Sequence, residues 1–242
     1  MTIQELLNLC NGLVTHYPLG TCKLPVGYPV AGRGFFPVLS GSFHSDSLTT
    51  TLKPRKLMFV GQDWGCEDYL FPLTRDKDND IKLGTGKILL ELLTEAKIPL
   101  QECFFTNALF GVRSGATNTG VSPGWKHPKF VGQCAKALLA QIEALRPSGI
   151  VCLGLHAPKL LAHLMPECDA WKSAKSFRSI DNSNNAVLNI QSLTGIKVAA
   201  ILLHPSFRQL NLKHRSYSSF VAHQAELKML ADVWWRVSNN PK

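Results

Sequence analysis

The stretch Lys56–Phe71, KLMFVGQDWGCEDYLF, decides the fold, because an apolar run in it stops at a glycine and polar residues follow at once. The run Leu57–Gly61 has the length and composition of a buried strand that ends at the rim of a sheet. In open α/β sheets, ligands bind beyond the carboxyl ends of the strands. We therefore predict that Asp63, two residues past this strand, faces a cleft.

The chain downstream alternates short apolar runs with helical patterns. Further strands are expected over Cys103–Leu109, Ile150–Gly154 and Val198–Leu203, and helices over Gly86–Lys97, Val131–Arg146, Pro158–Leu164 and Ser219–Val237. Since strands joined through helices pair in parallel, we predict a three-layer α/β/α sandwich with a central, mainly parallel four-stranded sheet. The segment Asp181–Leu203 can add a hairpin before the last strand, because its Asn/Ser cluster is a turn signal.

The chain length predicts a single domain spanning residues 1–242. A chain of 242 residues lies in the range of α/β domains with a full-sized core. We expect residues 1–55 to form a short helix over residues 3–14 and a covering loop rich in glycine, proline and aromatic residues. Residues 56–237 then form the α/β core.

The charge balance favours a polyanionic partner. The chain has 26 Lys and Arg against 17 Asp and Glu, a formal net charge of +9. Such an excess promotes nucleic-acid binding through counterion release, although it also aids solubility alone. We weigh nucleic acid above the second explanation.

The cysteines do not suggest a metal site. The seven are odd in number and include no Cys-x-x-Cys pair, so neither zinc nor an iron–sulfur cluster is indicated, and we expect no cofactor. Cys103, Cys134 and Cys152 lie in apolar segments, as buried reduced thiols do. Together with the lack of a secretory signal pattern or a long apolar run, this predicts a cytoplasmic monomer without a membrane partner.

Three of the predicted strand ends carry polar groups that suit chemistry on a nucleobase. Asp63 can hold a water or stabilise a cation, Asn107 offers a donor and an acceptor from one amide, and His204 can donate to a developing anion. Each residue has a purely structural alternative: an Asp caps a turn, an Asn satisfies backbone groups, and His-Pro-Ser ends a strand. Their expected meeting on one edge favours a shared site.

Four motifs in this order resemble those of the uracil-DNA glycosylase superfamily, from about Lys56 to Arg208. They are VGQDWG (60–65), FFTNALFGVRSG (104–115), GIVCLGLHAPKLL (149–161) and AAILLHPSFR (199–208). The first and last are the specific ones. The resemblance implies hydrolysis of an N-glycosidic bond in DNA.

The resemblance also implies a role for each of the three strand-end residues. The residue matching Asp63 positions the hydrolytic water and balances positive charge on the deoxyribose. The residue matching Asn107 reads the uracil edge, and the one matching His204 stabilises the departing uracil anion. Backbone groups around Gln62 would supply further donors to the base.

Other positions follow by analogy. An aromatic side chain normally stacks on the flipped base, and Phe71 is the better match for it, with Tyr69 as the alternative. Ser206 is expected to contact a DNA phosphate.

Residues after His204 are expected to meet the duplex. Phe207, Arg208 or Leu210 can wedge into it, or the loop can contact phosphate alone. Lys213 and Arg215 extend the basic character of this loop, and we expect both to bind DNA.

The first motif departs from the acid-bearing uracil enzymes, which continue with proline, tyrosine and histidine. This chain has Trp64, Gly65 and Cys66 there, so the tyrosine that excludes thymine is missing. The glycine is similar to other branches of the superfamily, whose first motif commonly lacks the acid.

The sequence thus predicts a metal-free, monofunctional DNA glycosylase that removes uracil or a related damaged base. One alternative is a nucleic-acid-binding protein of the same fold with altered catalysis, since Trp64 can fill the pocket. Another is an N-glycoside hydrolase that acts on free nucleosides or nucleotides, which the charge of +9 makes less attractive.

Overall fold

The computed structural model describes residues 1–23, 51–68, 84–117, 119–191 and 195–239. Most of the expected covering loop lies outside the described residues, and so do Tyr69 and Phe71. Among the described residues, no helix is long and apolar enough to span a membrane.

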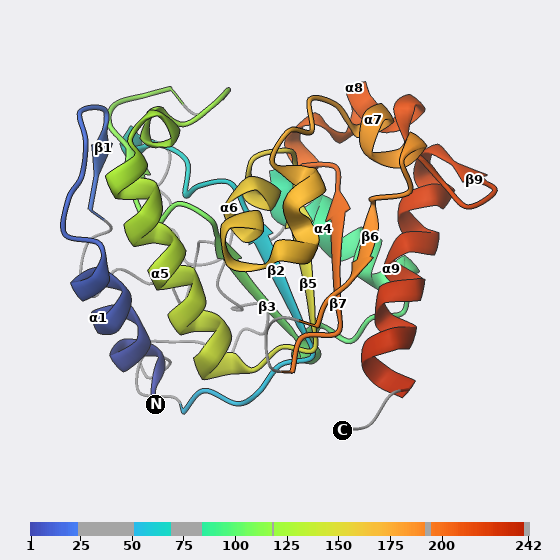
Figure 1. Ribbon diagram of the computed structural model, residues 1–242, viewed down its shortest axis with the longest axis horizontal. Coiled ribbons are helices and arrows are strands. Elements are labelled where there is room, and N and C mark those ends of the chain that lie inside the picture. The colour runs from blue at the N-terminus through green and yellow to red at the C-terminus, as the bar shows by residue number, and fades with distance from the viewer. Residues whose placement is uncertain (24–50, 69–83, 118, 192–194, 240–242) are drawn as a thin grey trace.

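A five-stranded sheet in the order β3-β2-β5-β7-β6 forms the centre of the molecule (Figure 1). Its strands are β2 (Leu57–Gly61), β3 (Cys103–Asn107), β5 (Gly149–Leu153), β6 (Val187–Asn189) and β7 (Val198–Leu202). The first four in the sheet order are mutually parallel, which confirms the predicted mainly parallel α/β sheet. Every residue of these four strands is buried, as expected for a sheet covered on both faces.

The predicted number of strands was wrong, because the sheet has five strands instead of four. The additional strand β6 pairs antiparallel with β7, with Val187 opposite Ala200 and Asn189 opposite Val198. The Asn/Ser-rich segment noted in the sequence precedes this strand. β6 is short and only partly buried, so its apolar pattern is weaker than that of the other strands.

Helices cover both faces of the sheet and complete the three layers. They are α1 (Ile3–Leu13), α4 (Gly84–Glu95), α5 (Pro128–Leu145), α6 (Ala157–Leu164), α7 (Phe177–Asn182), α8 (Arg208–Asn211) and α9 (Ala222–Asn239). In Figure 1, α5 and α6 lie in front of the sheet with α1 packed on α5, and α4 lies behind it, in contact with α9. The α5 stripe of apolar residues at spacings of three and four is buried, which explains why this helix forms here.

Short elements connect these layers. Two ribbons are formed by β1 (Thr21–Cys22) with β4 (Val112–Arg113) and by β8 (Ser216–Tyr217) with β9 (Phe220–Val221). Short 3-10 helices are η2 (Leu100–Glu102), η3 (Pro123–Lys126), η4 (Pro166–Trp171), η5 (Pro205–Phe207) and η6 (Leu212–His214).

All seven cysteines are free thiols, and six of them are buried. The expectation that Cys103, Cys134 and Cys152 are core residues is confirmed. Burial raises the pKa of Cys134 to about 12, so this thiol stays protonated and packs as a small apolar side chain.

A buried polar pair links β3 to α5. The Thr106 hydroxyl donates to Gln141 Oε1 at 2.6 Å, and the Gln141 amide donates to the Ala137 carbonyl at 3.2 Å. Both side chains are buried, so each hydrogen bond replaces one that water would otherwise make. Thr106 directly precedes Asn107, and the pair therefore anchors the end of β3.

Replacing Thr106 by valine should destabilise the fold. The substitution keeps the shape but leaves Gln141 Oε1 buried without its donor, which typically costs about 1–3 kcal/mol. Chemical denaturation should show this loss in the free energy of unfolding. The control is Thr94→Val on the exposed side of α4, where we expect a change within about 0.5 kcal/mol. Equal effects of the two substitutions would contradict the buried-pair explanation.

Candidate active site

The parallel sheet brings three of the predicted residues to one edge. Gly61 at the end of β2 pairs with Asn107 at the end of β3, and Asp63 follows two residues later. His204 stands two residues past the end of β7, which is separated from β2 by β5 alone. The carboxyl ends of β2, β3 and β7 therefore share an edge, as the sequence predicted.

Asp63 is held by three hydrogen-bond donors. Its Oδ1 accepts from the Gly65 amide at 3.1 Å, and its Oδ2 accepts from Arg113 Nε at 2.7 Å and Gln62 Nε2 at 3.3 Å. The side chain is only 7% exposed, and that of Arg113 only 5%. The carboxylate therefore lies in a buried ion pair.

Arg113, in the second of the four motifs, is directed into the protein and pairs with Asp63. Its guanidinium points inward from β4 and donates to the carbonyls of Thr119 at 2.6 Å and Gly120 at 2.9 Å. Gln62 Nε2 donates to the same Gly120 carbonyl at 3.1 Å. The alternation of a two-residue strand is too short a pattern to reveal that Arg113 is buried.

Asn107 has an unsatisfied side chain. The residue is 1% exposed, and neither Oδ1 nor Nδ2 has a hydrogen-bond partner among the described residues. Such groups are rare in proteins because a buried polar atom without a partner is costly. An amide of this kind can bind a ligand edge that offers one acceptor and one donor.

His204 presents one nitrogen to the site. Its Nδ1 accepts from the Ser206 amide at 3.3 Å, so in the neutral ring Nε2 carries the proton and is a donor. Burial lowers the pKa of His204, and the nearby Asp63 charge only partly offsets this. The ring lies against Gly154, where an added Cβ would come within 3.3 Å of His204 Cβ and where φ is +84°.

His156, at the start of α6, belongs to the same edge. Burial and then the Lys159 charge lower its pKa, whereas Asp63 acts in the opposite direction. Its ring centroid lies 6.0 Å from that of Trp125. The sequence placed His156 past a strand end but gave it no role.

The loop after His204 exposes apolar side chains. Phe207 is 43% exposed and Leu210 is 71% exposed, and the Phe207 ring centroid lies 6.4 Å from that of His204. Ser206 and Lys213 are also exposed. These four positions are therefore accessible to a macromolecule approaching this edge.

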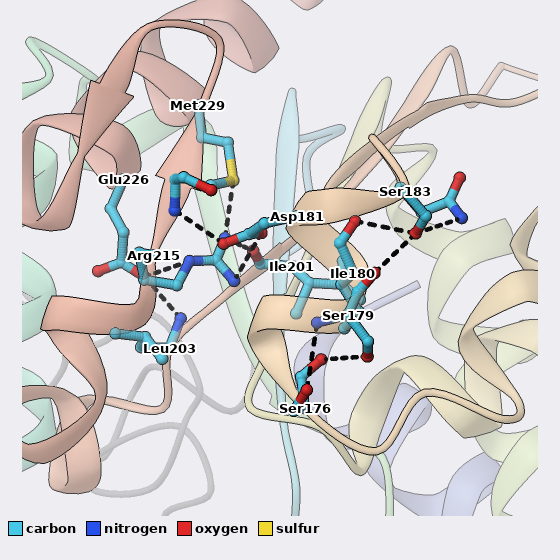
Figure 2. Close-up of polar contacts among 12 residues, drawn as sticks. Ser176, Ser179, Ile180, Asp181, Ser183, Ile201, Leu203, Arg215, Glu226 and Met229 are labelled. Atoms are coloured by element: carbon cyan, nitrogen blue, oxygen red, sulfur yellow. Dashed lines mark hydrogen bonds and ion pairs between the residues drawn. The ribbon is translucent and has the colours of Figure 1, made fainter.

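Arg208 and Arg215 were expected to bind DNA, but the structure buries both. Figure 2 shows Arg215 directed toward Asp181 and Glu226. Arg215 donates to the Ile201 carbonyl at 2.9 Å, and its Nη1 lies 3.4 Å from Asp181 Oδ1. The side chains of Arg215 and Asp181 have no exposed surface. A guanidinium in this position cannot contact a phosphate, so the expectation for Arg215 is wrong.

Glu226 of α9 connects this network to the His204 segment. Its Oε1 accepts from the Leu203 amide at 2.7 Å and its Oε2 from Arg208 Nε at 2.9 Å. Arg208 is 7% exposed and Glu226 is fully buried. The expected DNA contact of Arg208 is replaced by an internal ion pair, because α9 brings a carboxylate beneath the loop.

Polar side chains that converge at the carboxyl edge of an open α/β sheet are typical of α/β proteins that bind a ligand at this edge, and the present fold is of this class. A comparison with protein families matches residues 50–228 to the Uracil DNA glycosylase superfamily. The match spans most of the chain, and the protein therefore belongs to this superfamily. No curated protein matches the chain. Membership indicates a DNA glycosylase type of protein, with DNA as its partner.

Loss of Arg215 should destabilise the protein severely. Arg215→Met removes the cation beside Asp181 and leaves this buried carboxylate uncompensated, an effect that typically costs about 3–5 kcal/mol. Equilibrium denaturation measures the loss. Lys213→Met, two residues earlier and exposed, is the matched control and should change the free energy of unfolding by about 0.5 kcal/mol or less. A small effect of Arg215→Met would contradict the ion network.

The partly buried His204, whose pKa is lowered, also predicts a pH dependence of stability. Its folded-state pKa lies below the usual 6.5, so below pH 6.5 the unfolded chain binds a proton that the folded chain does not. The contribution is therefore complete above pH 6.5 and is lost as pH falls through the folded-state pKa. As pH falls, the melting temperature of His204→Gln should fall less steeply than that of the parent. His156, whose pKa is also lowered, should account for a further part of the slope. Exposed His163→Gln should leave the slope unchanged.

Proposed function

We propose that the protein hydrolyses the N-glycosidic bond of uracil or a related damaged base in DNA and leaves an abasic site. The observation that carries this proposal is the buried Asn107 amide, which has no hydrogen-bond partner among the described residues and lies on the same edge as Asp63 and His204. Membership of the superfamily supports DNA as the substrate. The Asn107 amide offers one donor and one acceptor, which supports recognition of the edge of a base.

Cleavage of this bond separates charge across the site. As the C1′–N bond breaks, its electron pair leaves with the base, and positive charge develops on the sugar. A water oxygen then bonds to C1′, and the proton that the water gives up neutralises the departed base anion. In the proposed mechanism Asp63 orients that water and opposes the sugar cation, while His204 Nε2 donates to the base anion.

The target base must leave the duplex to reach these groups. Flipping a base costs a few kcal/mol, and a damaged or mispaired base reduces this cost. In this proposal Phe207 and Leu210 fill the gap in the stack, and Ser206 and Lys213 contact phosphates; the exposure of all four side chains supports these roles. The +9 charge supports binding of a polyanion.

Direct hydrolysis fits the contacts of the site better than a Schiff-base mechanism. Among the described residues, no lysine is bonded to Asp63, Asn107 or His204. We therefore propose a monofunctional glycosylase. The cytoplasmic location and the monomeric state stay predictions.

One observation favours a second candidate, a DNA-binding protein with altered catalysis. Asp63 is already paired with Arg113 at 2.7 Å, so its charge is partly compensated before any substrate binds. A panel of oligonucleotides carrying uracil, hypoxanthine, xanthine or thymine mismatches separates the two candidates. Alkali cleaves the strand wherever a base has been excised. Tight DNA binding with no excision from any oligonucleotide would support the second candidate.

Two substitutions should slow excision under single-turnover conditions. Asp63→Asn keeps the shape but removes the charge, and should lower the rate constant by about 10²–10⁴-fold, the range of a positioned acid or base. His204→Ala should lower it by about 10²–10³-fold, as for loss of an oxyanion donor. Binding to abasic DNA should largely survive in both variants.

Matched controls use the same residue types outside the site. Asp169→Asn alters an exposed carboxylate paired with Lys172, and His163→Ala alters an exposed histidine at the end of α6. Both should excise at the parent rate. Excision by the parent protein that is unaffected by Asp63→Asn and His204→Ala would show that the assigned residues are wrong.

A further inference from the structure

We infer that Arg113 is a positioning residue that orients the Asp63 carboxylate for water activation and fixes the loop at Thr119 and Gly120 beside it. This inference rests on the proposed function. It concerns a residue outside the three strand-end groups, contributed by the short ribbon of β1 and β4.

Arg113 donates two hydrogen bonds to the segment from Asp63 to Gly65. Its side-chain Nε donates to Asp63 Oδ2 at 2.7 Å, and its backbone amide donates to the Gly65 carbonyl at 2.9 Å. Gly65 in turn donates its own amide to Asp63 Oδ1 at 3.1 Å. Both carboxylate oxygens are therefore fixed through contacts that converge on one residue of β4.

The geometry requires a guanidinium. Three nitrogens of Arg113 donate in different directions, to Asp63, to the Thr119 carbonyl and to the Gly120 carbonyl. A planar fork of five donors can do this from one buried position, whereas the single ammonium of lysine cannot reach all three with good geometry. The loop carbonyls and the carboxylate are thus held in one arrangement.

The remaining acceptor capacity of Asp63 then has a defined direction. A carboxylate offers about four lone-pair sites. Gly65, Arg113 and Gln62 supply three donors, so capacity is left for one further donor, such as a water. Two of these donors use Oδ2 and one uses Oδ1, so the remaining acceptor site lies on Oδ1.

The Arg113 charge also compensates a carboxylate that would otherwise face DNA phosphates. Asp63 and Arg113 are both at least nine-tenths buried, where an uncompensated charge is costly. The ion pair presents little net charge to a polyanion. The hydrogen bond from Arg113 uses Oδ2, so the pairing orients the carboxylate without occupying both of its oxygens.

A double-mutant cycle with single-turnover excision tests this inference. Arg113→Gln should slow excision by about 10–10²-fold, because a catalytic group displaced by about 1 Å loses that much. In the Asp63→Asn background the same substitution should change the rate by less than about threefold, since no carboxylate is left to position. Arg113→Lys should restore part of the rate by keeping the cation beside Asp63.

The control is Arg236→Gln. Arg236 lies in the last turn of α9, which is away from the carboxyl edge of the sheet (Figure 1), and its guanidinium donates to Asn189 Oδ1. It should excise at the parent rate. Equal slowing by Arg113→Gln with and without Asp63 would overturn the inference, because Arg113 would then act independently of the carboxylate. Unchanged excision in Arg113→Gln would overturn it as well.

A readout without catalysis separates this inference from the proposed function. Arg113→Gln should lower the melting temperature more in the parent than in the Asp63→Asn background. In the parent it leaves a buried carboxylate uncompensated, whereas in Asp63→Asn no carboxylate is present at this position. Additive losses would overturn the inference. A parent protein that excises no base but shows this coupling would contradict the proposed function and leave the Arg113–Asp63 linkage supported.

Discussion

Parallel pairing of β2, β3, β5 and β7 is the constraint on which the rest of the structure depends. Because these strands run in the same direction, their carboxyl ends gather Asp63, Asn107 and His204 at one edge although the residues are far apart in the chain. Antiparallel pairing would have sent alternate strand ends to opposite edges. The helices on both faces make this arrangement possible, because they supply the crossovers and bury the apolar strands.

Among the described residues, buried ion pairs occur in two separate parts of the protein, and in both parts an arginine side chain is directed inward. Near the edge, Arg113 pairs with Asp63, and beneath the last motif Arg208 and Arg215 surround Glu226. The two sites differ in consequence. Burial raises the pKa of Asp181 and lowers that of Arg215, so the ions of the second network are desolvated. The pair at the edge keeps one side of the carboxylate available.

The sequence predicted correctly the features that depend on a local pattern of residues. It did not predict the burial of side chains whose partners lie far away in the chain. Leu57–Gly61 and Val198–Leu202 are apolar runs bounded by polar residues, so their strands and the residues after them were evident. Arg208 and Arg215 looked like exposed basic residues because Glu226 and Asp181, which bury them, lie on other helices. The burial of Arg113 was not evident from the sequence for the same reason, since its partner Asp63 lies fifty residues earlier. β6 was visible only as a possible hairpin, because a short, half-buried strand has little pattern.

Stability and site geometry meet in the segment that carries His204. The Glu226 carboxylate accepts from Leu203 immediately before the histidine and from Arg208 four residues after it. Gly154 packs beneath the ring, and the Ser206 amide fixes its tautomer. The ring is therefore constrained from the preceding residue, the following residues and a neighbouring strand end. Since interactions that are arranged before the reaction need no reorganisation when charge develops, the buried network under this loop contributes to the site without contacting a substrate.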